Sequence, residues 1–260
     1  MGERGALEFT EMKTVACAIQ KGGVGKTSTS VHLAFNFVER GLRVAMIDLD
    51  TQGNASQTLK EYACGVSSSA LFDSVSLTDI EATGLVLFEA DAKLATLEKM
   101  STQDAVRAFR RSLVTLKTRG FDVCVIDTPP ALGVAMVAAL ASSSHVVSPV
   151  EMEIYSIQGI KKMLQTLANV RQVNPNLSFI GMFASKVDSR NPRHVAHLTE
   201  LRAAYPDLLL PTSIGLRSSI ADALARGIPV WQVQKTTARE ASRELRALSD
   251  HIAHAMEIDR

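Results

Sequence analysis

The chain has 260 residues, with 46% hydrophobic content and a formal net charge of +1. This length allows one well-buried α/β domain rather than two large ones, and the near-zero charge excludes a globally basic nucleic-acid-binding protein. The three cysteines, Cys17, Cys64 and Cys124, lack metal-ligand spacing, and neither a signal peptide nor a transmembrane run is recognisable, so we expect a cytoplasmic protein.

The first part of the chain predicts a tail, a strand and a helix. Residues 1–11 are polar and without pattern, so we expect a disordered tail there and one folded domain over residues 12–260. Lys13 to Ile19 form a β-branched, apolar run typical of a buried strand. Apolar residues recur at helical spacing from Thr27 to Arg40, and Gly41 ends the predicted helix.

The loop between this strand and this helix reads Gln-Lys-Gly-Gly-Val-Gly-Lys-Thr-Ser over residues 20–28. Its end matches the pattern G-x-x-x-x-G-K-[ST], in which backbone N–H groups and a helix N-terminus surround the phosphates of a nucleotide. Lys26 can reach between the phosphates, and the Thr27 hydroxyl stands where Mg²⁺ binds, so the loop predicts a magnesium–nucleotide site. The expected contacts to the nucleotide come from Lys21, Gly22, Gly23, Val24, Gly25, Lys26, Thr27 and Ser28.

The rest of the chain alternates apolar, strand-like runs with segments of helical periodicity. Such alternation predicts a doubly wound, mainly parallel α/β sheet with helices on both faces. Residues 60–100 are the least regular part, and we assign no function to them. The predicted strands cover Arg43–Ile47, Leu85–Phe88, Phe121–Ile126, His145–Val147, Leu177–Ala184 and Leu208–Ser213. The predicted helices cover a segment after Phe88, Thr102–Leu116, Ser156–Val173, Pro192–Ala204, Ser218–Arg226 and a last helix from Lys235.

Carboxylates follow two of the predicted strands. Asp48 and Asp50 come directly after the second strand, and Asp127 ends the run Phe121–Ile126, at the position of a Walker B aspartate in P-loop proteins. From there Asp127 would hold Mg²⁺, partly through water, together with Thr27. The alternative for Asp127 is a helix-capping role.

A second lysine at the front of the loop, Lys21, sets it apart from an ordinary P-loop, which begins with glycine where this chain has Gln20. In these features the loop resembles the deviant Walker A ATPases of the ParA/MinD group, whose loop reads x-K-G-G-x-G-K-[ST]. The resemblance implies that Lys21 is the signature lysine, which crosses an ATP-dependent homodimer and touches the phosphates bound by the other subunit. The alternative is a solvated lysine in an ordinary P-loop.

The resemblance extends to the segment after the second strand, where the family motif is D-x-D-P-Q-x-N. Its second aspartate, here Asp50, orients the water that attacks the γ-phosphate, while Thr51 replaces the usual proline. The implied activity is slow, partner-stimulated hydrolysis of ATP with Mg²⁺ as cofactor. The implied catalytic residues are Lys21, Lys26 and Asp50, and the further nucleotide contacts are Asp48, Gln52 and Asp127.

Two further segments, Tyr155–Lys162 and Gly215–Leu224, resemble plasmid partition ParA proteins of the IncC type. The resemblance implies a dimeric switch ATPase that segregates plasmid or chromosomal DNA with a ParB-type centromere-binding protein. In the ATP state it would bind DNA non-specifically and lie on the nucleoid. The nearest alternative is a ParA-like ATPase that positions another cargo, such as a protein cluster or division-site machinery, and a more distant one is a non-enzymatic scaffold.

The last predicted helix carries a basic face opposite an apolar face, which favours non-specific contacts with the DNA backbone. Glu240 and Glu244 soften that basic face, so a solvated helix surface is the alternative. Two acids stand among the last four residues, and we therefore expect no membrane anchor. The expected DNA-binding residues are Arg190, Arg193, Arg217, Lys235, Arg239, Arg243 and Arg246.

Two kinds of metal centre lack ligands in this sequence. Iron proteins that share the loop need cysteines beyond the Walker B strand, and no cysteine follows Cys124. His194 and His197 stand at i, i+3 on a predicted helix, but no carboxylate or cysteine stands at ligand spacing. We expect both histidines to belong to the surface or to the basic patch.

Overall fold

A computed structural model of the chain describes residues 12–73, 77–153 and 156–258. The strands are β1 Lys13–Cys17, β2 Val44–Asp48, β3 Ala63–Ser67, β4 Leu85–Glu89, β5 Val123–Asp127, β6 His145–Glu151, β7 Ser178–Val187 and β8 Leu209–Gly215. They form one parallel sheet in the order β3-β4-β2-β5-β1-β6-β7-β8. The predicted doubly wound fold is confirmed, whereas the expected disordered tail, residues 1–11, lies outside the described residues.

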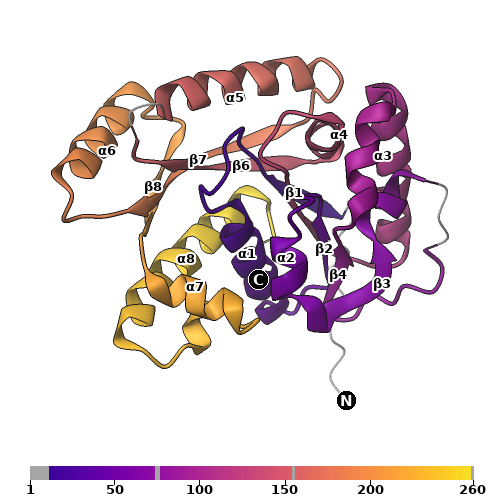
Figure 1. Cartoon of the computed structure of the whole chain (residues 1–260), viewed down its shortest axis with the longest axis horizontal. Helices are drawn as coiled ribbons and strands as arrows, with labels where there is room; N and C mark the ends of the chain where they lie inside the picture. The colour runs from indigo at the N-terminus through magenta and orange to yellow at the C-terminus, as the bar shows by residue number, and fades with distance from the viewer. Residues whose placement is uncertain (1–11, 74–76, 154–155, 259–260) are drawn as a thin grey trace.

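Helices cover both faces of this sheet (Figure 1). The α-helices are α1 Lys26–Glu39, α2 Asn54–Thr58, α3 Thr102–Thr118, α4 Val134–Ser142, α5 Ser156–Arg171, α6 Pro192–Ala204, α7 Ser218–Ala225 and α8 Thr236–Ala255. Short 3₁₀ helices are η1 Lys60–Tyr62, η2 Ser68–Phe72, η3 Ala92–Lys99 and η4 Val230–Gln232. Within the described ranges, no helix is both long and apolar enough to span a membrane.

The described residues form three core clusters, and two of these, on opposite faces of the sheet, hold the layers together. Phe109 of α3 and Met163 of α5 belong to one cluster, and Phe37 of α1 and Leu245 of α8 belong to the other. Along the central strand β1 the side chains alternate between these clusters, as the period of two in a strand requires. Burial on both faces explains why β1 reads as a continuous apolar run.

The loops that carry chemistry meet at one edge of the sheet. β1 lies between β5 and β6, so the chain leaves β1 at the point where the strand order changes direction. In the strand register Cys17 and Asp48 are both paired with Asp127. The carboxyl ends of β1, β2 and β5 therefore stand at the same level, and the loops that follow them are neighbours.

Among the strands and α-helices of the described residues, three have no counterpart in the predicted series: α2, β3 and α4. Buried residues occupy nearly every position of α4, so this helix has no polar face and no amphipathic period to detect. β3 lies at the edge of the sheet with half-buried or exposed residues, which removes the apolar run of a central strand. α2 has only five residues, too few for a periodic signal.

Candidate nucleotide-binding site

The glycine-rich loop follows β1 and leads directly into α1. Gly25 precedes the helix with a φ of 96°, in the left-handed region that favours glycine. A Cβ at this position would lie 2.8 Å from the Ser185 hydroxyl oxygen, so space as well as conformation requires glycine. No side chain of the described residues caps this end of α1, and its N–H groups are therefore available to a phosphate.

Lys26 is held inside the curve of the loop. Its side chain is buried, and its Nζ donates a hydrogen bond to the backbone oxygen of Lys21 at 2.8 Å. An ammonium group has three donors, so phosphate oxygens can bind it without breaking this contact. The loop thus presents a fixed positive charge to the space in front of α1.

Asp127 is fully buried at the end of β5 and faces the start of α1. Thr27 Oγ1 donates to its Oδ2 at 2.7 Å, and Ser30 Oγ donates to its Oδ1 at 3.2 Å. Its carboxylate thus bonds side-chain hydroxyls, which argues against the helix-capping alternative. Burial and, to a smaller extent, the neighbouring carboxylate of Asp48 together raise the pKa of Asp127 to about 7.

Oxygen donors of this kind suit Mg²⁺, and a cation beside Asp127 would offset the cost of burying its negative charge. The hydroxyl of Thr27 and the carboxylate of Asp127 lie within hydrogen-bond distance of one another, next to the phosphate-binding loop. The residues present therefore fit this ion. Thr27 and Asp127 are the groups that would hold it, Asp127 partly through water.

Asp48 is fully buried behind the segment that carries Asp50, and does not line the nucleotide cavity where we expected it. Its Oδ1 accepts from the backbone N–H of Asp50 at 3.1 Å, and its Oδ2 accepts from the N–H and Oγ of Ser56 at 2.8 and 2.7 Å. Burial raises the pKa of Asp48, while these hydrogen bonds partly offset that shift. Asp48 therefore positions Asp50, which is half-buried and lines the cavity.

A cavity of about 490 Å³ lies in front of the loop. Most of the predicted nucleotide contacts line it, but the side chain of Val24 is buried in the core, and Gln52 is exposed outside the lining. The lining residues are Gly22, Gly23, Gly25, Lys26, Thr27, Ser28, Asp50, Asn54, Gln57, Thr58, Pro130, Lys186, Leu224 and Ala225. Asp50 and the phosphate-binding loop therefore line the same cavity.

Several of these lining residues carry no sequence signal for a nucleotide site. Pro130, Lys186 and Leu224 come from segments far from the P-loop in sequence, and the fold alone brings them to the cavity. Lys186 has a φ of 54°, which is unusual for a residue other than glycine and which is typical of functional sites. Its Nζ donates to the backbone oxygen of Gly23 in the P-loop.

Lys21 lies outside the lining of the cavity and is held by two carboxylates of its own chain. Its Nζ forms an ion pair with Glu153 and another with Glu151 at 3.2 Å. Glu151 also pairs with Lys186 at 3.3 Å. Carboxylates at the carboxyl end of β6 thus hold Lys21, at the front of the P-loop, and Lys186, which contacts that loop at Gly23.

The predicted DNA-binding residues fall into two groups. Three of them are engaged within the protein: Arg217 bonds Glu240 and Glu244, each at 2.7 Å, and Lys235 bonds Asp222 at 2.5 Å. Arg246 bonds Glu39 at 2.8 Å and lies 4.3 Å from the ring centre of Trp231. The exposed residues whose guanidinium groups have no acidic partner in the described part of the chain are Arg190, Arg193, Arg239 and Arg243.

The two histidines considered as metal ligands do not form a metal site. His194 Nδ1 accepts a hydrogen bond from the backbone N–H of Asp188 at 3.1 Å, and His197 lies 3.9 Å from Glu200. The described residues contain no group of three or more side chains that could hold a metal ion by themselves.

Comparison with known proteins extends the similarity over nearly the whole chain. A family profile described as an AAA domain matches residues 12–179. Over 257 residues the chain is 56% identical to Protein IncC of Escherichia coli, which covers 95% of this chain and 71% of that protein. Over 231 residues it is 32% identical to the chromosome-partitioning ATPase Soj of Thermus thermophilus, with 87% and 90% covered.

A solved structure has the same fold and holds a nucleotide. Cobyrinic acid a,c-diamide synthase from Mycobacterium smegmatis, with bound ADP and magnesium, superimposes with a TM-score of 0.74 at 28% identity. The match covers 94% of this chain and 96% of that one. The architecture described above therefore accommodates a nucleotide together with magnesium.

Proposed function

Because this chain belongs to the ParA/MinD-type family of P-loop ATPases, we propose that it is the ATP-driven switch of a DNA partition system. It is an ATPase with Mg²⁺ as cofactor. The observation that carries the proposal is a nucleotide cavity of about 490 Å³ accompanied by a second lysine, Lys21, which stands outside the cavity. In our proposal, the Lys21 side chain acts across a dimer interface and not in the nucleotide site of its own subunit.

The phosphate-binding loop and Asp50 have separate tasks in hydrolysis. Lys26 and the N–H groups of the loop bind the β- and γ-phosphates and stabilise the charge that develops on them. Bound Mg²⁺ neutralises phosphate charge. Asp50, held in place by Asp48, orients a water for in-line attack on the γ-phosphorus. The bond from that phosphorus to the ADP oxygen then breaks, and ADP and phosphate leave.

Lys21 couples this reaction to assembly. In our proposal ATP draws Lys21 away from Glu151 and Glu153 and across the interface, where it binds the phosphates of the second subunit. Loss of the γ-phosphate removes the partner that Lys21 gained, so the ion pairs within the chain form again and the dimer opens. Such an enzyme acts as a timer rather than as a metabolic catalyst.

The output of the switch is non-specific binding to duplex DNA. Arg239 and Arg243 lie one helical turn apart on α8 and are exposed, and Arg190 and Arg193 are exposed near the start of α6. These arginines are able to contact phosphates, whereas Arg217, Lys235 and Arg246 would first have to leave their acidic partners. A dimer presents two copies of the surface, which makes DNA binding depend on ATP.

A ParB-type centromere-binding protein is the proposed partner, and it would stimulate hydrolysis. We place the protein in the cytoplasm, on the nucleoid when ATP is bound. The similarity to IncC and Soj favours DNA as the cargo over a protein cluster or the division-site machinery.

The test is a salt titration of binding to two unrelated duplexes, with ATP and with ADP. Wild type should bind both duplexes with ATP and weakly with ADP. Removal of one arginine that neutralises a phosphate should reduce the slope of log K against log salt by about 0.9, so Arg243→Ala should flatten the slope. Arg246→Ala, on the same helix but paired with Glu39, is the matched control and should change it less. No ATP-dependent affinity of wild type for either duplex would leave a protein-positioning ATPase in place of the partition switch.

A further inference from the structure

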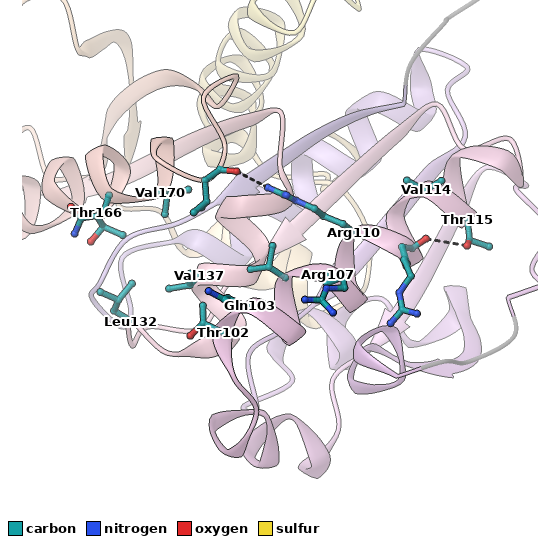
Figure 2. A pocket seen from close by; sticks show the side chains of 14 residues that line it. Thr102, Gln103, Arg107, Arg110, Val114, Thr115, Leu132, Val137, Thr166 and Val170 are labelled. Atoms are coloured by element: carbon teal, nitrogen blue, oxygen red, sulfur yellow. Dashed lines mark hydrogen bonds between the residues drawn. The ribbon is translucent and has the colours of Figure 1, made fainter.

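A large hollow lies away from the nucleotide site. A groove of about 1010 Å³ runs between α3 and α5, with α4 beneath it (Figure 2). α3 contributes residues from Thr102 to Thr115, a length of about 20 Å at 1.5 Å per helical residue. α5 contributes Thr166, Asn169 and Val170, and Val173 lies two residues after the end of that helix. The walls are therefore two helices that could receive a third.

Apolar side chains contribute to the lining of the groove, and three of them are exposed. Val114, Val173 and Leu132 are 60%, 58% and 47% exposed, and these are three of the seven large apolar side chains that are exposed in the described part of the chain. An enclosed small-molecule pocket would bury most of its lining. A cluster of exposed valine and leucine side chains beside an open groove is instead typical of a surface that another protein covers.

The charge along the groove has one sign. Arg107 and Arg111 lie four residues apart on α3, and both are exposed, so they form a row along one wall (Figure 2 labels Arg107). Arg110 donates to the backbone oxygens of Ala141 and Val173, at 2.6 and 3.1 Å, and is thereby fixed between the two walls. None of the described residues that line the groove is acidic. Asp104, which lies 3.7 Å from Arg107, is outside the lining.

We propose that this groove binds an amphipathic helix of a partner protein, with apolar residues on one face and carboxylates along its flank. The apolar face would cover the valines of α3 and the end of α5, and the carboxylates would pair with Arg107 and Arg111. The α3 side of the groove, which is about 20 Å long, matches the length of a helix of roughly four turns. This inference rests on the groove alone and does not depend on the proposed partition function.

The position of the groove connects such a partner with the nucleotide site. Leu132 lines the groove, and Pro130, two residues earlier in the loop after β5, lines the nucleotide cavity. The same loop leads from Asp127 into α4, whose first N–H group, that of Val134, is capped by the carboxylate of Glu98 at 2.9 Å. A helix in the groove would therefore contact the loop that joins Asp127 to α4.

The test uses two designed, fluorescently labelled helical peptides of about four turns. Both carry leucine at i, i+3, i+4 and i+7, one with glutamates and the other with lysines on the remaining flank positions. Fluorescence anisotropy with the full chain should detect binding of the glutamate peptide and at least tenfold weaker binding of the lysine peptide. Val114→Asp and Arg111→Glu should each lower the affinity for the glutamate peptide at least tenfold, since each places a carboxylate in the groove where the peptide binds.

Matched controls come from α6, where Val195 is an exposed valine and Arg202 an exposed arginine. Val195→Asp and Arg202→Glu should leave the affinity unchanged, and unchanged ATP turnover should confirm that the groove variants are folded. Equal binding of the two peptides, no binding of the glutamate peptide, or wild-type affinity in both groove variants would overturn the proposal. A tenfold rise in affinity when residues 1–11 are removed would also overturn it, because the groove would then belong to this chain's own segment.

Discussion

Lys26 and Asp50 line the same cavity, and we propose that they act at different stages of the reaction. Lys26 is buried and its charge is fixed inside the loop, so it acts on the bound nucleotide itself. In the proposed mechanism Asp50, which lines the same cavity, acts on the attacking water. The structure adds Asp48 to this description as a positioning residue rather than as a ligand.

We expect Lys26→Ala to lose ATP binding and Asp50→Ala to keep it while losing turnover by roughly 100-fold or more, the range for removal of a general base or water-orienting group. Titration of a fluorescent ATP analogue and a phosphate-release assay measure the two quantities. Thr51→Ala is the matched control, because Thr51 is exposed and outside the cavity lining. An equal loss of nucleotide affinity in both variants would refute the separation of roles.

His32 connects α1 with η4 in the core below the P-loop. Its Nδ1 bonds the Ser28 carbonyl at 2.6 Å and its Nε2 accepts from the Val230 N–H at 3.1 Å, so the ring is neutral, with its proton on Nδ1. Burial lowers the pKa of His32 to about 4 from 6.5. The unfolded chain therefore binds a proton before the folded protein does, and stability is lost as the pH falls from 6.5 towards 4.

The expected loss from His32 at pH 5 is about 2 kcal/mol of unfolding free energy. Urea unfolding at pH 7.5 and at pH 5 should give a difference that is smaller by about that amount in His32→Gln than in wild type. His145, whose pKa burial also lowers, is present in both proteins and cancels in the comparison. The same difference in both proteins would mean that His32 does not carry the pH dependence.

Among the elements, the end of β6 controls the two lysines beside the P-loop. Glu151 pairs with Lys21 at 3.2 Å and with Lys186 at 3.3 Å. We expect Glu151→Gln to remove one of the two ion pairs that hold Lys21, leaving the pair with Glu153, and to strengthen ATP-dependent dimerisation two- to fivefold, since a single partly exposed ion pair contributes up to about 1 kcal/mol. Sedimentation velocity over a range of ATP concentrations measures this. Glu200→Gln, at an exposed glutamate of α6, is the control, and weaker or unchanged dimerisation in Glu151→Gln would contradict the restraining role.

The helices and strands also differ in how well the local sequence predicts them. The sequence predicts β1, α1 and the loop between them from three local signals. These are the apolar run of a buried parallel strand, the glycine that ends the helix, and the glycines that the loop requires. α4 has no such signal, because it is apolar on every side, and β3 has none, because an edge strand is only half-buried. The contribution of Glu98 to the start of α4 depends on a contact between η3 and α4, which no local pattern encodes.

The same limit applies to the site. The P-loop and Asp50 are contiguous motifs, and the structure brings them to one cavity as expected. Pro130, Lys186 and Leu224 reach that cavity only through the order of the strands, and the pairing of Arg217 with Glu244 depends on the packing of α8 beside β8. Periodicity predicts the basic face of α8, but it does not indicate which of its arginines are already paired.

At the scale of the whole molecule, we propose that ATP causes two subunits to form a dimer and that Lys21 is needed for this association. Light scattering of the Asp50→Ala protein, in which hydrolysis is prevented, measures this conversion directly. With ATP the mass should rise from 28.1 kDa towards twice that value, and with ADP it should not. Adding Lys21→Ala should keep ATP binding but leave the protein largely monomeric, whereas adding Lys161→Ala, at an exposed lysine of α5, should not. A normal ATP-dependent dimer without the Lys21 side chain would contradict the claim and make Lys21 an ordinary loop residue.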